Sequence, residues 1–220
     1  MLPALLRMEG VGRHYGDRPV LDSVSVSVAA GRCVAVTGDN GSGKSTLLRL
    51  AVGREQPTSG AVWFQGAPVD AADLATRARI ATVMDAGAYD PDLTVREHVL
   101  LAAVAHGLGA DADEAVDDVL AEHRLTDRAD AFPDLVSAGQ VQAMLLAAAF
   151  VRPHALLVLD EPERRLDARA RKELIERLVA HKRRGAAILL TTHHEALARA
   201  VADRILDLDD ESPTSTRSPA

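Results

Sequence analysis

A glycine-rich run at residues 38–45, Gly-Asp-Asn-Gly-Ser-Gly-Lys-Ser, constrains the fold more than any other part of this chain. It matches in full the eight-position P-loop pattern, which ends in glycine, lysine and serine or threonine. The apolar residues 33–37 before it predict a buried strand, and Leu47, Leu48 and Leu50 after it predict a helix. A strand, a loop and a helix in this order are typical of an α/β protein with a parallel sheet.

The residue types in this loop predict a site for the phosphates of a nucleotide. Glycines let the backbone turn its N–H groups inward toward phosphate oxygens, and the following helix adds the partial positive charge of its N-terminus. Lys44 is expected to reach the β- and γ-phosphates, and the Ser45 hydroxyl is expected to ligate Mg²⁺. A glycine-rich turn that binds nothing is the alternative, and the strand and helix on either side disfavour it. The expected nucleotide-binding residues are Gly38, Asp39, Asn40, Gly41, Ser42, Gly43, Lys44, Ser45 and Thr46.

A second apolar run, residues 156–159, ends in a pair of carboxylates, Asp160 and Glu161. Asp160 at the end of a strand is placed to hold Mg²⁺ through water. Glu161 is placed one residue further, where it can act on the water that attacks the γ-phosphate. Alone, this pair could be an acidic turn at a strand end, but the complete P-loop favours the catalytic interpretation.

The remaining pattern predicts one α/β domain over residues 1–208, followed by a disordered tail at 209–220. Residues from about 86 to 140 have helical spacing and no convincing strand, which indicates an inserted helical subdomain. Strands that alternate with helices elsewhere imply a largely parallel sheet. The expected strands are 24–28, 33–37, 61–65, 80–84, 155–159, 186–190 and 204–208, and the expected later helices are 167–184 and 195–202.

Charge and composition narrow the function. The net charge of −7, from 25 basic and 32 acidic residues, argues against a general nucleic-acid binder. No run approaches the roughly 18 apolar residues of a membrane span, and no signal peptide is recognisable, so we expect a soluble chain inside the cell. The single cysteine, Cys33, is expected to be a buried strand residue. Six histidines have no assigned role, and most of them are expected to be solvated: His98, His106, His123, His154, His181 and His194.

Taken together, these motifs resemble the ABC ATPase family, and the resemblance covers nearly the whole chain. The P-loop and the Leu-Asp-Glu-Pro ending at 159–162 are the closest matches. Val136-Ser137-Ala138-Gly139-Gln140 resembles the Leu-Ser-Gly-Gly-Gln signature found only in this family. Three shorter matches complete the set: Thr192-His193 to the switch-histidine motif, Tyr15 to the aromatic residue that stacks on adenine, and Thr94-Val95-Arg96-Glu97 to the start of the helical subdomain.

The resemblance implies a P-loop NTPase fold with a RecA-like sheet, an N-terminal antiparallel β subdomain and the inserted helical subdomain. It also implies a head-to-tail dimer around two Mg-ATP. In that dimer Ser137, Ala138, Gly139 and Gln140 contact the ATP held by the other subunit, and Asp167 lies at the dimer seam. His193 is expected to sense the γ-phosphate.

The implied partners are a second ATP-binding subunit and a membrane-spanning transporter subunit, with no nucleic acid. The implied location is cytoplasmic, at the inner face of the membrane.

Three positions depart from the family pattern. Asp85 replaces the usual glutamine after the strand at 80–84 and is expected to act on Mg²⁺, although a position in solvent or on a partner is the alternative. Ala138 replaces a glycine of the signature. Residues 163–165, Glu-Arg-Arg, replace small residues before Leu-Asp. These changes put the rate of hydrolysis in doubt rather than ATP binding.

Three classes of function compete. A transporter motor is favoured on family analogy. A soluble ABC ATPase of translation or DNA repair would resemble two linked domains or carry long coiled coils, which this sequence does not show. A non-catalytic partner would be expected to lose Lys44 or Glu161, and both are present. The short core favours an exporter over an importer, and the cargo cannot be read from this chain.

Overall fold

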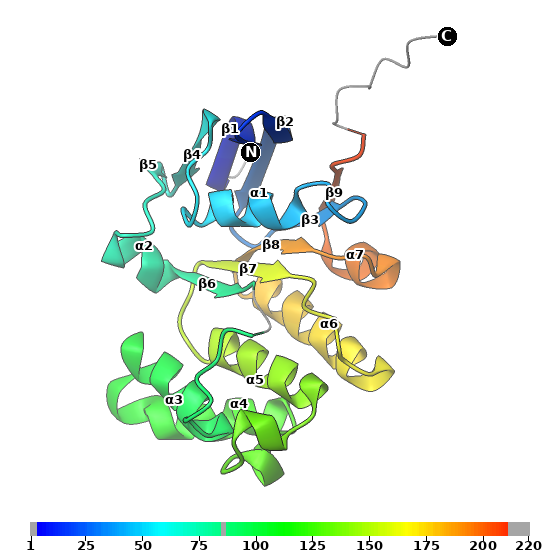
Figure 1. Cartoon of the computed structure of the whole chain (residues 1–220). Coiled ribbons are helices and arrows are strands. Elements are labelled where there is room, and N and C mark those ends of the chain that lie inside the picture. Colours follow the sequence, from blue (N-terminus) through cyan, green and yellow to red (C-terminus); the bar gives the residue numbers. More distant parts are fainter. Residues whose placement is uncertain (1–3, 85–86, 211–220) are drawn as a thin grey trace.

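The computed structural model describes residues 4–84 and 87–210, which form two sheets and a group of helices (Figure 1). One sheet is antiparallel with the strand order β2-β1-β4-β5 and the other is parallel with the order β6-β7-β8-β3-β9. The antiparallel strands are β1 (Ala4–Tyr15), β2 (Arg18–Ala29), β4 (Ser59–Phe64) and β5 (Ala67–Pro68). The parallel strands are β3 (Cys33–Thr37), β6 (Ile80–Val83), β7 (Leu156–Asp160), β8 (Ala187–Thr191) and β9 (Arg204–Asp207). The predicted fold class, with its parallel sheet and N-terminal antiparallel sheet, is confirmed.

The parallel sheet is covered on both faces, which explains its uninterrupted apolar strands. Helix α1 (Lys44–Ala51) and the antiparallel sheet cover one face, and α6 (Ala168–Arg183) and α7 (Glu195–Val201) lie on the other (Figure 1). Side chains of β3 therefore enter two separate apolar cores. Cys33 lies in one of them and is fully buried, as predicted, and its burial raises the pKa of the thiol to about 12.

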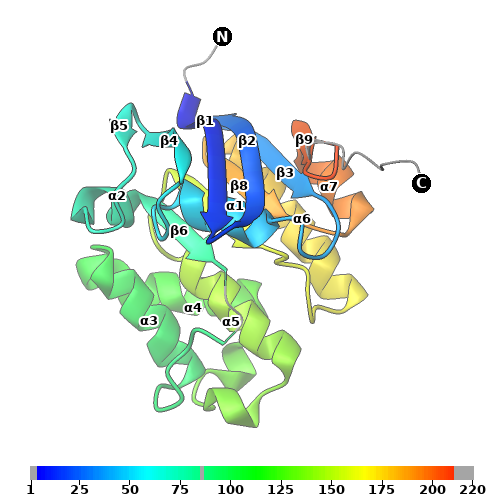
Figure 2. The same ribbon diagram turned by 45° about the horizontal axis from the view of Figure 1, so that its top comes forward.

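The helical region projects from the carboxyl side of β6 and contains α3 (Val95–Ala105), α4 (Ala112–Glu122) and α5 (Ala138–Phe150) (Figure 2). Helix α3 packs against both α4 and α5, so this group continues past the expected end near residue 140. Thr94 caps α3 through a capping box with Glu97, which explains why the helix begins there. No helix within 4–84 and 87–210 is long and apolar enough to cross a bilayer.

Strand β1 was not predicted, although it is central in the antiparallel sheet. Its inward residues Leu6, Met8 and Val11 are buried against β2 and β4. The pairing with β2 changes register between Met8 and Val11, so the apolar residues lose their strict alternation. Because the period-two pattern is broken by this irregularity, the sequence alone did not indicate the strand.

The expectation of solvated histidines is wrong for three of them. The rings of His123, Phe150, His181 and His154 form a chain of contacts, with centroid distances of 5.6, 4.5 and 5.5 Å between successive rings. Residues from α4, α5 and α6 meet here, which spacing along the sequence did not reveal. His123 is 8% exposed, and burial lowers its pKa to about 4; the pKa of His181 is lowered to about 4 by burial and by His154 and Arg184.

This cluster predicts a loss of stability in mild acid. Below about pH 6.5 the unfolded chain takes up protons at His123 and His181, while the folded chain does not until about pH 4, so the free energy of unfolding falls as the pH is lowered across that range. For His123 the difference corresponds to roughly 3 kcal/mol. Urea unfolding at a series of pH values should show a shallower pH dependence for His123→Gln than for the parent. The exposed His14→Gln variant is the control and should keep the parent slope.

Candidate nucleotide-binding site

The glycine-rich loop joins β3 to α1 and has the curled backbone that its sequence predicts. Gly38, Gly41 and Gly43 have φ angles of 139, 89 and 97°, in the region that favours glycine. At Gly43 a Cβ atom would lie 2.7 Å from the Leu21 side chain and 2.9 Å from the Val20 carbonyl oxygen, so only glycine fits under β2. The glycines therefore give the loop the backbone turns of a phosphate-binding loop, directly before the N-terminus of α1.

Lys44 is drawn back over the loop. Its Nζ donates hydrogen bonds to the carbonyl oxygens of Gly38 and Asp39, each at 2.7 Å, and the residue is 6% exposed. An ammonium group has three donors, so one remains for a phosphate oxygen. The buried Ser42 hydroxyl has no partner among the described residues and is a further donor in the loop. These observations fit a polyphosphate ligand.

Asp209 contacts the glycine-rich loop although it lies 170 residues after Asp39 in the sequence. Its Oδ2 accepts a hydrogen bond of 2.7 Å from the backbone N–H of Asp39. The expectation that the disordered tail begins at residue 209 is therefore wrong for this residue, because β9 delivers it beside β3. Residues 211–220 of the predicted tail lie outside the described residues.

Ser45, Asp160 and Glu161 line one cavity of about 150 Å³, together with Gln142 and Arg164. Asp160 ends β7 and its Oδ1 accepts a hydrogen bond of 2.5 Å from the Thr191 hydroxyl. The parallel pairing of β7 with β8 sets this contact, since Asp160 lies opposite Thr191. A hydroxyl and a carboxylate oxygen are hard ligands of the kind that Mg²⁺ prefers, so Ser45 and Asp160 would suit this ion.

Glu161 is held by both of its neighbours in this site. Its Oε1 lies 3.1 Å from His193 Nε2 and its Oε2 lies 3.2 Å from Arg164 Nε. The Glu161 backbone N–H donates to the Thr191 hydroxyl at 2.9 Å, and its φ of 45° turns the chain sharply away from β7. This turn directs the carboxylate into the cavity, where it is paired with Arg164 and His193.

The signature segment forms the start of α5. Ser137 caps the helix through a capping box, in which its Oγ accepts from the Gln140 N–H at 3.2 Å and Gln140 Oε1 accepts from the Ser137 N–H at 2.9 Å. Ser137 and Ala138 are exposed. Gly139 cannot carry a side chain without movement, because a Cβ atom would lie 2.8 Å from the Arg165 carbonyl oxygen. The segment is thus free to meet a second molecule but is closely packed on the 163–165 turn.

The other expected site residues lie apart from the cavity. Tyr15 ends β1, and its hydroxyl donates to Glu55 while Arg13 lies 4.7 Å from its ring centroid. Asp167 is exposed and caps α6 by accepting from the Ala170 N–H at 2.7 Å. Thr46 is buried in α1, and Asn40 is exposed at the tip of the loop. Asp85, the predicted metal ligand, lies outside the described residues.

Gln142 is a cavity residue that the sequence reasoning missed. It is 3% exposed, and its Nε2 donates to the Pro162 carbonyl oxygen at 3.2 Å. This bond ties α5, which begins with the signature, to the turn that carries Glu161. An uncharged polar residue among the buried positions of an apolar helix was the available signal, since buried polar groups need a specific partner.

The strand, loop and helix at residues 33–51, with a carboxylate pair at the end of β7 in the same sheet, define a nucleotide-binding α/β protein of the P-loop class. Comparison with known proteins makes the class more specific. Residues 21–164 match the ABC transporter family. A solved structure described as the ATP-binding subunit of an ABC transporter is 34% identical to this chain and superposes on it with a TM-score of 0.85. The match covers 93% of this chain and 86% of the chain in that structure.

Two curated relatives give a similar result. Nod factor export ATP-binding protein I of Bradyrhizobium diazoefficiens is 38% identical, over 91% of this chain and 66% of the relative. The protein of the same name from Paraburkholderia xenovorans is 34% identical, over 100% of this chain and 73% of the relative. The chain therefore spans about two thirds of the length of these relatives. It belongs to the ABC transporter family, among the ATP-binding subunits, and the predicted ABC ATPase class is confirmed.

Proposed function

We propose that this chain binds Mg-ATP at residues 38–46 and hydrolyses it as the motor of a transporter that exports its cargo. The observation that carries the proposal is the single cavity in which Ser45, Asp160 and Glu161 meet, beside a complete P-loop. A metal-binding hydroxyl, a metal-binding carboxylate and a general base are the groups that phosphoryl transfer to water requires. Their positions depend on β3 and β7, which are rigid strands of one sheet.

The loop residues bind and orient the substrate. Lys44 offers its third N–H to the phosphates, and the N–H groups of the loop and of the first turn of α1 surround their oxygens. Tyr15 is exposed at 43% and offers a ring for stacking on adenine. When Mg²⁺ is bound by Ser45 and Asp160, it supplies a positive charge that offsets the charge on the phosphates. Asp85 remains a proposed contributor to this metal site.

Glu161 and His193 act at the end of the phosphate chain. Glu161 accepts a proton from the attacking water, and His193, at 3.1 Å from it, holds the carboxylate and reports the presence of the γ-phosphate. Arg164 competes for the same carboxylate at 3.2 Å in this structure. Since Arg164 has a largely exposed side chain, it can leave Glu161 when a nucleotide and a second subunit arrive.

The exposed signature completes the site from a second molecule. Ser137, Ala138, Gly139 and Gln140 are offered to the ATP of a partner subunit, with Asp167 at the seam. A solved ATP-binding cassette with the same fold, 23% identical with a TM-score of 0.83, is described as a dimer bound to ADP and Pi. A head-to-tail dimer at the cytoplasmic face of a membrane, attached to a membrane-spanning subunit, agrees with these features.

We favour export over import as the direction of transport, because the names of the curated relatives contain the word export. The direct test is to purify the chain from membranes in mild detergent with a tag and to identify the protein that co-purifies. A membrane-spanning protein that raises the ATPase rate of the chain would support the proposal. Recovery with ribosomes or with soluble proteins alone, and no stimulation by any membrane protein, would favour a non-transport ATPase.

A further inference from the structure

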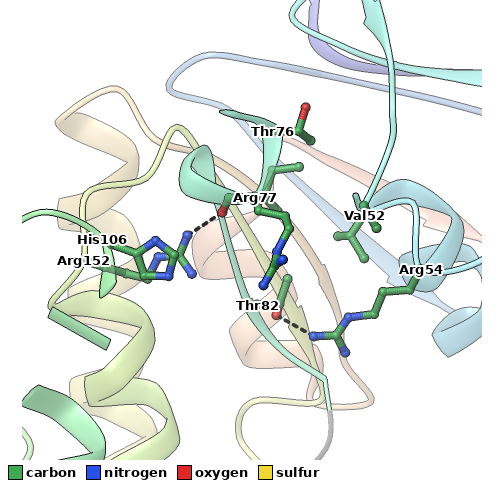
Figure 3. A pocket seen from close by; sticks show the side chains of 9 residues that line it. Val52, Arg54, Thr76, Arg77, Thr82, His106 and Arg152 are labelled. Carbon is green, nitrogen blue, oxygen red and sulfur yellow. Dashed lines mark hydrogen bonds between the residues drawn. The ribbon is translucent and has the colours of Figure 1, made fainter. Parts of the chain in front are cut away.

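A second polar cavity, of about 360 Å³, opens between α2 (Leu74–Arg79), the end of α1 and the helical region (Figure 3). Its polar wall consists of Arg54, Thr76, Arg77, Thr82, His106 and Arg152. No residue of this lining is a carboxylate, and none is shared with the cavity that contains Ser45 and Asp160. The cavity is therefore basic and separate from the nucleotide site.

Two of the three guanidinium groups of this cavity, those of Arg54 and Arg152, donate hydrogen bonds to neutral partners. Arg152 Nη2 donates to the carbonyl oxygens of Arg77 and Ala78 at 2.7 and 3.2 Å, and Arg54 Nη2 donates to the Thr82 hydroxyl at 3.2 Å (Figure 3). Arg152 Nε is buried without a partner. Within residues 4–84 and 87–210, no carboxylate forms an ion pair with any of these three arginines. Their charges therefore have no compensating anion in the described part of the chain.

Such an arrangement is unfavourable for the protein alone. Burial and the nearby Arg77 lower the pKa of Arg152 to about 10, and burial with Arg152 and Arg77 lowers the pKa of His106. Both effects have the sign expected for cations that face one another in a partly dry space. An anion that enters the cavity would reverse them.

We propose that this cavity binds a phosphate-type oxyanion, either a free phosphate compound or the phosphate headgroup of a lipid. The lining supplies donors from α2, β6 and the segment after α5, so they approach from several directions. A tetrahedral phosphate presents oxygens in all of these directions, whereas a planar carboxylate accepts in one plane. A cavity of about 360 Å³ also leaves room for the organic part of such a ligand.

The test is a titration of inorganic phosphate into the full chain saturated with a non-hydrolysable ATP analogue, which occupies the phosphate positions of the P-loop. We expect saturable binding, read by calorimetry or by ³¹P NMR. Arg152→Gln should weaken it about tenfold or more, in line with the loss of a charge-assisted contact. Arg79→Gln is the matched control, because Arg79 is an exposed arginine of α2, the helix that carries Arg77, and it does not line the cavity.

A second variant separates a loss of phosphate binding from a loss of folding. Arg54 is exposed and bonds only to Thr82, so Arg54→Gln should fold normally, as checked by thermal unfolding, and should also weaken binding. A further measurement with vesicles of phosphatidylcholine, with and without phosphatidic acid, identifies the source of the ligand. Arg54-dependent binding to vesicles that contain phosphatidic acid, without binding of free phosphate, indicates a lipid headgroup. The reverse result indicates a soluble ligand.

Three results would overturn the proposal. The first is no saturable binding of phosphate and no selective binding of the acidic vesicles. The second is an equal loss in Arg79→Gln, which would indicate non-specific attraction. The third is capture of the membrane partner through Arg54 and Arg152 with no phosphate binding, which would make the cavity a protein docking site. None of these measurements depends on ATP hydrolysis, so failure here leaves the proposed motor function intact.

Discussion

Replacing Glu161 by glutamine is expected to lower ATP turnover about a hundredfold while nucleotide binding survives. The substitution keeps the size of the side chain and its bond to His193, but it removes the only base that the cavity offers near Ser45 and Asp160 among the described residues. Phosphate release measured with Mg²⁺ and saturating ATP gives the rate, and gel filtration with ATP should show an accumulated dimer.

The matched control is Glu195→Gln, at an exposed glutamate that pairs with Arg199 on α7. Its turnover should equal that of the parent. Undiminished phosphate release by the Glu161 variant, together with a monomer at all ATP concentrations, would contradict both the catalytic role of Glu161 and the ATP-bound dimer.

Replacing Lys44 by alanine is expected to weaken ATP binding about ten- to a hundredfold. The Lys44 ammonium is buried and already positioned by two loop carbonyls, so its contact with phosphate is charge-assisted in a partly dry site and is worth on the order of 1.5–3 kcal/mol. Titration with a fluorescent ATP analogue measures the change in affinity.

Because Lys44 also closes the loop, a loss of affinity must be separated from a loss of structure. Lys44→Met keeps most of the apolar stem and should bind as weakly as Lys44→Ala, while thermal unfolding confirms that both variants are folded. Lys172→Ala, at an exposed lysine of α6, should bind like the parent. An affinity equal to the parent in either Lys44 variant would refute the nucleotide site at this loop.

The Arg164 contact indicates how the unusual 163–165 turn affects these rates. Arg164 pairs with Glu161, and the Arg165 carbonyl oxygen packs against Gly139 of the signature. The 163–165 turn therefore contacts both Glu161, the proposed base, and the signature segment, which we propose to contact the ATP of a second subunit. A small residue in place of Arg164 would remove this ion pair, and in the proposed mechanism the release of Glu161 from Arg164 precedes hydrolysis.

The sequence by itself predicted the parts of this protein that depend on local chemistry. A glycine loop between a buried strand and a helix can form few structures, because its backbone angles and its N–H groups are prescribed by the glycines at 38, 41 and 43. Uninterrupted apolar strands likewise required a parallel sheet covered on both faces. The positions of Asp160 and Glu161 at a strand end followed from this local pattern.

Tertiary structure alone decided which distant residues share an environment. Gln142 reaches the turn after β7 from another element, Asp209 reaches the loop through the pairing of β9 with β3, and His123 becomes buried where α4, α5 and α6 meet. Arg54, Arg77 and Arg152 are far apart in the sequence and would each be taken as solvated charges. The physical reason is that burial and charge compensation depend on which surfaces pack together, and periodicity along one segment carries no information about its neighbours in space.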